Sequence, residues 1–191
     1  MIEQLPTRVL DRIKESIENN KSIIVSGESG TGKTTLIKDL LNYIPKDERV
    51  TLIGDFESDK DVPTDGFKVE YLREQSNRIV WDETRVTDMT KIYNVIKNGQ
   101  SVITSVHSTI DHRLTGSTAK VVDDLIDRTM REYDERRARY DGVDIHDTFY
   151  QSVGLVLGVD RELIEDGETT YNIRTVLEPH EHKPIIVYRK K

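Results

Sequence analysis

A glycine-rich segment at residues 22–35, SIIVSGESGTGKTT, has residue types and spacing suited to holding phosphate. Gly27, then four residues, then Gly32, Lys33 and Thr34 make the phosphate-binding loop pattern. Glycines let successive backbone N–H groups point at one anion, and the following helix adds its N-terminal donors. We expect Lys33 to reach the β- and γ-phosphates and the Thr34 hydroxyl to bind Mg²⁺. The predicted nucleotide-binding residues are Gly27, Glu28, Ser29, Gly30, Thr31, Gly32, Lys33, Thr34 and Thr35.

Two adjacent carboxylates, Asp82 and Glu83, end an apolar run and form the second half of a nucleotide-binding signature. One carboxylate of such a pair holds Mg²⁺, usually through water, and the other polarises the attacking water. Because successive strand residues face opposite sides, we expect only one of the two to point squarely at the nucleotide. The predicted metal-binding residues are Thr34, Asp82 and Glu83.

Two further candidates, Asp55 and His107, close the apolar segments at residues 49–55 and 100–108. If these segments are parallel strands, both residues reach the edge of the sheet where ligands bind. Asp55 would then orient a water or the metal shell, unless it serves as a cap or turn residue. His107 would donate a hydrogen bond to the γ-phosphate, unless its role is structural. The predicted catalytic residues are Lys33, Asp55, Asp82, Glu83 and His107.

The elements that must position these residues alternate between strand and helix patterns. Strand patterns at 23–25, 49–55, 78–83 and 100–108 are interleaved with helix patterns at 36–44 and 89–96, which predicts right-handed βαβ units. Residues 67–72 predict a short strand. Near the C-terminus, 153–159 and 170–177 predict an antiparallel hairpin turning at Asp166-Gly167, followed by a last strand at 184–188.

Two more helices are predicted outside these units. Pro6 begins an amphipathic helix that we expect to pack on the sheet rather than serve as an interaction helix. A long helix at 117–134 precedes a charge run at 132–139, which favours a solvated helix end over an intersubunit patch. The buried stripe expected on the long helix is Ala119, Val122, Leu125, Ile126, Thr129, Met130 and Tyr133.

Composition limits the remaining function classes. The 191 residues suit one domain, which we place at 21–191 after an N-terminal helix within residues 1–20. A net charge of −7 argues against strong direct binding to nucleic acid. The chain has no cysteine, so it offers neither disulfides nor thiolate metal ligands. It has no apolar run of membrane-spanning length and no signal peptide pattern, and we expect a cytoplasmic protein.

In this order the motifs resemble the ATPase domain of the secretion and conjugation traffic ATPases. These are the hexameric motors of type II and type IV secretion, pilus assembly and conjugative DNA transfer. The resemblance covers about residues 20–178 and rests on the phosphate loop and its helix at 23–50, TLIGD at 51–55, RIVWDETR at 78–85 and ITSVHST at 103–109. It implies an α/β P-loop NTPase fold, with a RecA-like, mostly parallel sheet flanked by helices and ending in the antiparallel hairpin.

The resemblance also implies roles for single residues. Glu83 matches the glutamate that aligns the attacking water, Arg85 the arginine after it, and His107 the family histidine. An arginine from a neighbouring subunit would complete the site, with Arg85 and Arg113 as candidates. The implied cofactors are ATP and Mg²⁺.

Two positions depart from the family pattern. Asp82 stands where the family usually has glycine, and Gly54 stands where its acidic strand usually carries glutamate. Compared with the family pattern, one carboxylate has therefore moved from the end of one strand to the end of the next. The candidates for the catalytic base are Asp55, Asp82 and Glu83. Family members also carry an N-terminal domain, whereas residues 1–20 precede the first strand here. We expect an excised or minimal ATPase domain, or a neighbouring P-loop branch.

The leading interpretation is a Mg²⁺-dependent ATPase motor whose hydrolysis depends on assembly. Its expected partners are copies of itself, in a hexameric ring, and proteins of a membrane transfer apparatus at the inner face of the membrane. One alternative is a nucleotide-binding assembly module with little turnover. Another is a small P-loop kinase.

Overall fold

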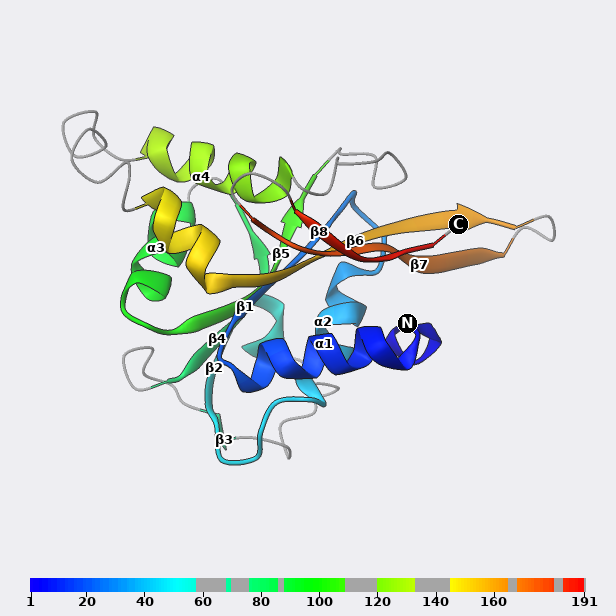
Figure 1. The fold of residues 1–191 in the computed structure, drawn as a ribbon, viewed down its shortest axis with the longest axis horizontal. Coiled ribbons are helices and arrows are strands. Elements are labelled where there is room, and N and C mark those ends of the chain that lie inside the picture. The colour runs from blue at the N-terminus through cyan, green and yellow to red at the C-terminus, as the bar shows by residue number, and fades with distance from the viewer. Residues whose placement is uncertain are drawn as a thin grey trace.

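A computed structural model describes residues 1–57, 68–69, 76–85, 88–108, 120–132, 145–164, 168–180 and 184–190. Within these residues one eight-stranded sheet runs in the order β3-β2-β4-β5-β1-β6-β7-β8 (Figure 1). The strands are β1 (Ser22–Gly27), β2 (Arg49–Ile53), β3 (Lys68–Val69), β4 (Arg78–Thr84), β5 (Ser101–His107), β6 (Val153–Leu163), β7 (Thr169–Glu178) and β8 (Ile185–Arg189).

The sheet is parallel from β3 to β6 and antiparallel from β6 to β8. The C-terminal ends of β1, β2, β4 and β5 therefore meet at one edge, with β5 between the phosphate-loop strand β1 and the carboxylate-bearing strand β4. The predicted fold class is confirmed. The protein has a mostly parallel sheet flanked by helices, with an antiparallel hairpin near the C-terminus. The β6–β7 hairpin projects beyond the other strands (Figure 1).

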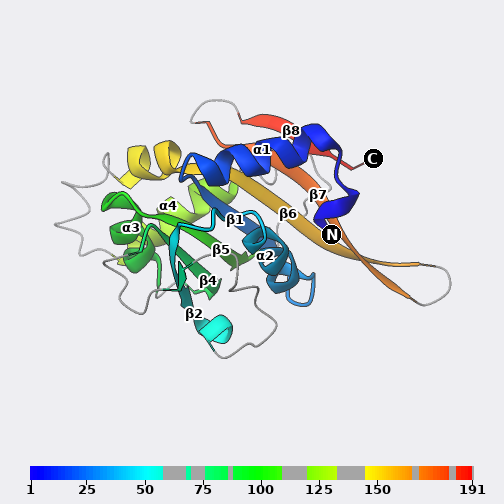
Figure 2. The same cartoon turned by 90° about the horizontal axis from the view of Figure 1, so that it is seen from below.

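Helices cover both faces of the sheet (Figures 1 and 2). On β1, Ile23 and Val25 point into one core cluster and Ile24 into the other, as the two-residue period of a strand requires. The first cluster is covered by α1 and α2, and the second by α3 and α4. The helices are η1 (Ile2–Gln4), α1 (Thr7–Glu18), α2 (Lys33–Leu41), η2 (Gly54–Glu57), α3 (Met89–Lys97), α4 (Lys120–Glu132) and an unlabelled helical segment at 145–152.

The N-terminal helix α1 packs against β1 and β6, as predicted. Its stripe of Val9, Ile13 and Ile17 is buried in the core, so these side chains are not free for a partner. The first strand lies where the sequence placed it, and the helix after it, α2, ends at Leu41 rather than continuing to Ile44.

In helix α4, one residue that was predicted to lie in the core is exposed. Val122, Leu125, Ile126 and Thr129 are buried as expected, but Met130 is 37% exposed. Each step of four residues turns a helix by about 40° beyond a full circle, so the stripe drifts off the buried face by residue 130. Ala119 and residues 133–139, which include Tyr133 and the charge run beyond Glu132, lie outside the described residues.

Other boundaries also differ from the predictions. The second strand ends at Ile53 and turns into η2, the predicted strand at 67–72 is described only at Lys68–Val69, and β6 continues to Leu163. The helical segment at 145–152 was not predicted, although it buries Ile145 and Phe149 one turn apart. The turn at residues 166–167 lies outside the described residues.

A buried arginine ties the base of the carboxylate strand to the first helix. Arg78, at the start of β4, is fully buried and donates to Glu48 Oε1 at 2.6 Å, to Ile17 O at 2.7 Å and to Lys21 O at 3.2 Å. Burial lowers the pKa of Arg78, and the Glu48 carboxylate opposes that shift. The ion pair and the two carbonyls satisfy a charge that would otherwise be costly to bury.

Replacing Glu48 by glutamine should therefore lower the free energy of unfolding by about 1–3 kcal/mol, because the buried guanidinium of Arg78 keeps a hydrogen-bond acceptor but loses its neutralising charge. Urea titration followed by circular dichroism measures the change. Glu15→Gln is the matched control, since Glu15 pairs with Arg12 at the exposed surface and such pairs contribute about 0.2–1 kcal/mol. Equal losses in the two variants would contradict a special role for the buried pair.

Candidate active site

The glycine-rich loop leaves the end of β1 and enters α2 through left-handed backbone. Gly30 and Gly32 have φ of 71° and 83°, which L-side chains rarely adopt, and Gly32 is the N-terminal cap of α2. At Gly27 a Cβ would stand 2.6 Å from the Val159 carbonyl oxygen on β6. The glycines are therefore required by backbone shape at two positions and by space at the third.

Hydrogen bonds across the loop hold it closed. The Thr31 hydroxyl and Lys33 Nζ both donate to Glu28 O, each at 2.8 Å. Lys33 is only 7% exposed, and burial lowers its pKa, an effect that the charges of Glu83 and Asp82 oppose. The loop thus keeps an ammonium group in a position that favours a multiply charged anion as its partner.

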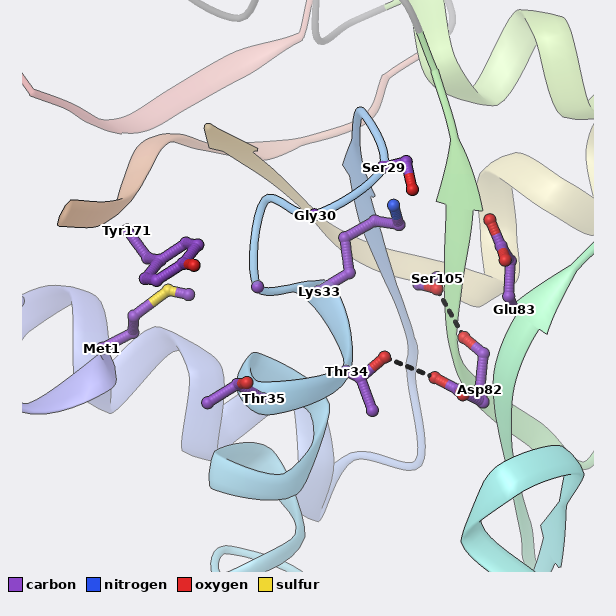
Figure 3. Close-up of a pocket in the computed structure, with 11 residues that line it drawn as sticks. Met1, Ser29, Gly30, Lys33, Thr34, Thr35, Asp82, Glu83, Ser105 and Tyr171 are labelled. Carbon is purple, nitrogen blue, oxygen red and sulfur yellow. Dashed lines mark hydrogen bonds between the residues drawn. The ribbon is translucent and has the colours of Figure 1, made fainter. Parts of the chain in front are cut away.

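The hydroxyl of Thr34 joins the loop to the carboxylate strand, donating to Asp82 Oδ1 at 2.8 Å (Figure 3). The Ser105 hydroxyl on β5 donates to the main-chain oxygen of Asp82. The pairing of β4 with β5 shifts by one residue between Trp81 and Glu83, which is a β-bulge. Bulges re-aim side chains, and both Asp82 and Glu83 line the same pocket. That only one of them points squarely at the nucleotide stays a prediction.

These elements enclose a pocket of about 490 Å³ at the C-terminal edge of the sheet. Of the predicted residues, Gly27, Glu28 and Thr31 shape the loop without lining the pocket. Met1, Ser105 and Tyr171 also line it and were not predicted. These residues are far from the loop along the chain, and no local sequence pattern indicates that they approach it. The lining residues are Met1, Ser29, Gly30, Gly32, Lys33, Thr34, Thr35, Asp82, Glu83, Ser105 and Tyr171.

The structure places His107 apart from this pocket. It is exposed at the end of β5, level with Gly27 in the strand pairing. Its side chain lines a second hollow, of about 510 Å³, with Ser108 and residues of α4. Its role as a sensor of the γ-phosphate stays a prediction.

The structure describes Asp55 and the two candidate arginines, Arg85 and Arg113, only in part. Asp55 lies in η2, directly after β2, and its side chain is outside the described residues. A Cβ at its neighbour Gly54 would stand 3.4 Å from Asp82 Cβ, so the two positions at which the chain departs from the family pattern adjoin in space. Arg85 is exposed just after β4, and Arg113 is not described.

The donor set suits Mg²⁺. This ion prefers hard oxygen ligands and uses one or two protein carboxylates together with water and substrate phosphates. Thr34, Asp82 and Glu83 line the pocket and carry oxygen donors of this kind, and no group of three or more His, Cys, Asp or Glu among the described residues forms a complete metal cage. None of the described helices combines the length and apolarity needed to cross a membrane.

The chain is similar to several known proteins. A family model described as Novel STAND NTPase 3 matches residues 5–105. An uncharacterized Bacillus anthracis protein is 30% identical over 121 residues, which cover 54% of this chain and 27% of the relative. The type IV secretion system protein VirB11 of Bartonella henselae is 42% identical over 43 residues, which cover 22% of this chain and 12% of the relative. The chain thus spans no more than about a quarter of the length of these relatives.

Two solved structures share the fold. The VirB11 ATPase of the Brucella suis type IV secretion system, in complex with sulphate, matches with a TM-score of 0.64 at 22% identity, over 89% of this chain and 52% of that one. The Yersinia pseudotuberculosis ATPase DotB matches with a TM-score of 0.59 at 15% identity, over 93% and 49%. The resemblance to secretion ATPases is confirmed, and the chain spans about half the length of these structures.

Proposed function

The chain belongs to the Novel STAND NTPase 3 family, and from this premise we propose that it is a Mg²⁺-dependent ATPase whose turnover depends on assembly. The observation that carries the proposal is the convergence of Lys33, Asp82 and Glu83 on one pocket, with Thr34 bonded to Asp82. A cation above a glycine-rich helix start and a pair of carboxylates facing it are the parts that phosphoryl transfer needs.

Each residue then has a chemical task. The loop amides and Lys33 hold the β- and γ-phosphates. The Thr34 hydroxyl and the Asp82 carboxylate are the side chains that would hold Mg²⁺, which neutralises charge developing on the transferring phosphoryl group. Glu83 extends into the same pocket without a bond to Thr34, and we assign to it the alignment of the attacking water.

The balance of charges in the pocket gives a physical reason why ATP hydrolysis would depend on assembly. Among the described lining residues, Lys33 is the one side-chain cation, against the carboxylates of Asp82 and Glu83, and the N-terminal ammonium of Met1 is paired with Asp39. Arg161 on β6 comes near Gly30, with Nη1 3.4 Å from where a Cβ would stand, but it does not line the pocket. An arginine supplied by a neighbouring subunit would add the missing charge, and such an arginine is worth about 10³–10⁵ in rate.

We place the protein, by the same reasoning, in a homo-oligomeric ring, with a hexamer as the expected form. Its VirB11 relative is a type IV secretion system protein, which supports a role with the protein components of a membrane transfer apparatus. Net charge supports a protein cargo or partner over direct nucleic-acid binding. We expect the ring to work in the cytoplasm, peripheral to the membrane.

Phosphate release from ATP, measured over a wide range of protein concentration, tests this function. Turnover per protomer should rise with concentration as assembly proceeds, and removal of Mg²⁺ by a chelator should abolish it. Concentration-independent turnover in a verified monomer would contradict assembly dependence and point to a cation of the same chain, such as Arg161. Tight ATP binding without release at any concentration would favour the assembly module instead, and transfer to a small-molecule acceptor would favour a kinase.

A further inference from the structure

The pocket changes character along its length. Lys33, Asp82 and Glu83 lie toward one end, whereas Met1 and Tyr171 lie side by side at the other (Figure 3). A Cβ added to Gly32 would stand 3.1 Å from Met1 Cε and 3.3 Å from Tyr171 Cδ1. The end formed by the Met1 thioether and the Tyr171 ring therefore begins directly beside the turn that starts α2, while the Met1 ammonium is paired with Asp39.

Tyr171 reaches this place from the projecting hairpin. It lies on β7 opposite Arg161 on β6, and it is 45% exposed. Core packing does not account for an aromatic ring that is half open and lines a pocket beside a glycine. An exposed aromatic face next to a polarizable thioether is instead a surface on which a flat, apolar group can stack.

We propose that Tyr171, with Met1 beside it, is the stacking platform for the base of the bound nucleotide. The inference rests on the proposed function, because phosphates held by Lys33 at the polar end direct the ribose and base toward the opposite end of the same pocket. Gly32 keeps the space between the two ends open, since any side chain there would meet both Met1 and Tyr171.

The stacking platform also determines which nucleotides the site should bind. Stacking tolerates any base, because every base has a π-face, and selection among bases requires hydrogen bonds to their edges. Besides Tyr171 itself, the described residues around Gly32 that line this part of the pocket offer the Thr35 hydroxyl and the Met1 ammonium as hydrogen-bonding groups, and the ammonium already pairs with Asp39. The site should therefore accept nucleoside triphosphates without a strong preference among bases, with ATP and GTP binding with similar affinity.

Calorimetric titration of the whole chain with ATP, GTP and inorganic tripolyphosphate tests the platform. Tyr171→Ala should weaken ATP and GTP binding equally, by about 5- to 150-fold, which is the loss expected for one base–aromatic stack. Tripolyphosphate has no base, so its affinity should stay unchanged. Tyr171→Phe should retain the parent affinities because the ring remains, and Leu163→Ala, on an exposed residue of the same hairpin, should leave all three affinities unchanged.

The outcomes separate this inference from the proposed function. Unchanged ATP binding in Tyr171→Ala, or an equal loss of ATP and tripolyphosphate, would overturn the platform while leaving the phosphate site intact. A strong preference of the parent protein for ATP over GTP would overturn the predicted breadth of substrate. Failure of tripolyphosphate to bind the parent protein would instead overturn the phosphate site itself.

Discussion

Replacing Lys33 by methionine is expected to weaken ATP binding by about 10- to 150-fold and to abolish measurable hydrolysis. Hydrogen bonds to charged groups are worth about 1.5–3 kcal/mol, which sets the loss of affinity. The change also removes the positive charge of Lys33, which interacts with the carboxylates of Asp82 and Glu83 in the parent protein. Bound phosphates would then share the pocket with these two negative charges and no lysine. Methionine keeps the length of the side chain and tolerates the buried position, so the effect reports charge rather than packing.

Titration calorimetry and phosphate release measure the two effects, with circular dichroism to verify folding. Lys91→Met is the matched control, because Lys91 is an exposed lysine of α3 that pairs with Asp88 and does not line the pocket. The control should retain the parent affinity and rate. A folded Lys33→Met protein that binds ATP as tightly as the parent would remove the basis for a phosphate site at this loop.

Replacing Glu83 by glutamine is expected to lower the maximal rate of hydrolysis by about 10²–10⁴ while leaving ATP affinity nearly unchanged. That range is the usual contribution of a positioned acid or base to proton transfer. Glu83 lines the pocket but does not hold the Thr34 hydroxyl, so its loss should affect the attacking water more than the bound nucleotide.

Asp82→Asn and Asp55→Asn distinguish the three candidate carboxylates. Because Asp82 accepts the Thr34 hydrogen bond, Asp82→Asn should raise the Mg²⁺ concentration needed for both binding and hydrolysis. Asp55→Asn should have the smallest effect of the three if Asp55 only caps or turns the chain. Steady-state rates and Mg²⁺ titrations of the assembled protein give the comparison. A larger loss of rate in Asp55→Asn than in Glu83→Gln would move the base to the tip of β2.

Much of the fold follows from local patterns. Alternating apolar runs and helical stripes predicted β1, α2, β4, α3 and β5 in the right order, because burial on both faces of a parallel sheet imposes continuous apolar strands. The segment at 145–152 was missed because two buried residues in a short helix make little periodic signal. Met130 was misplaced because a stripe drifts as a helix lengthens.

For the site, the sequence by itself determined the loop, since its glycine spacing, Lys33 and Thr34 are contiguous and their conformation is local. It also determined that carboxylates would stand at the ends of neighbouring strands. Only the tertiary structure decided that Asp82 and Glu83 both line one pocket beside a bulge in β4, that Thr34 bonds Asp82 across 48 residues of chain, and that Tyr171 lies beside Gly32. These contacts depend on strand register and on the position of a distant hairpin, which no short stretch of sequence encodes.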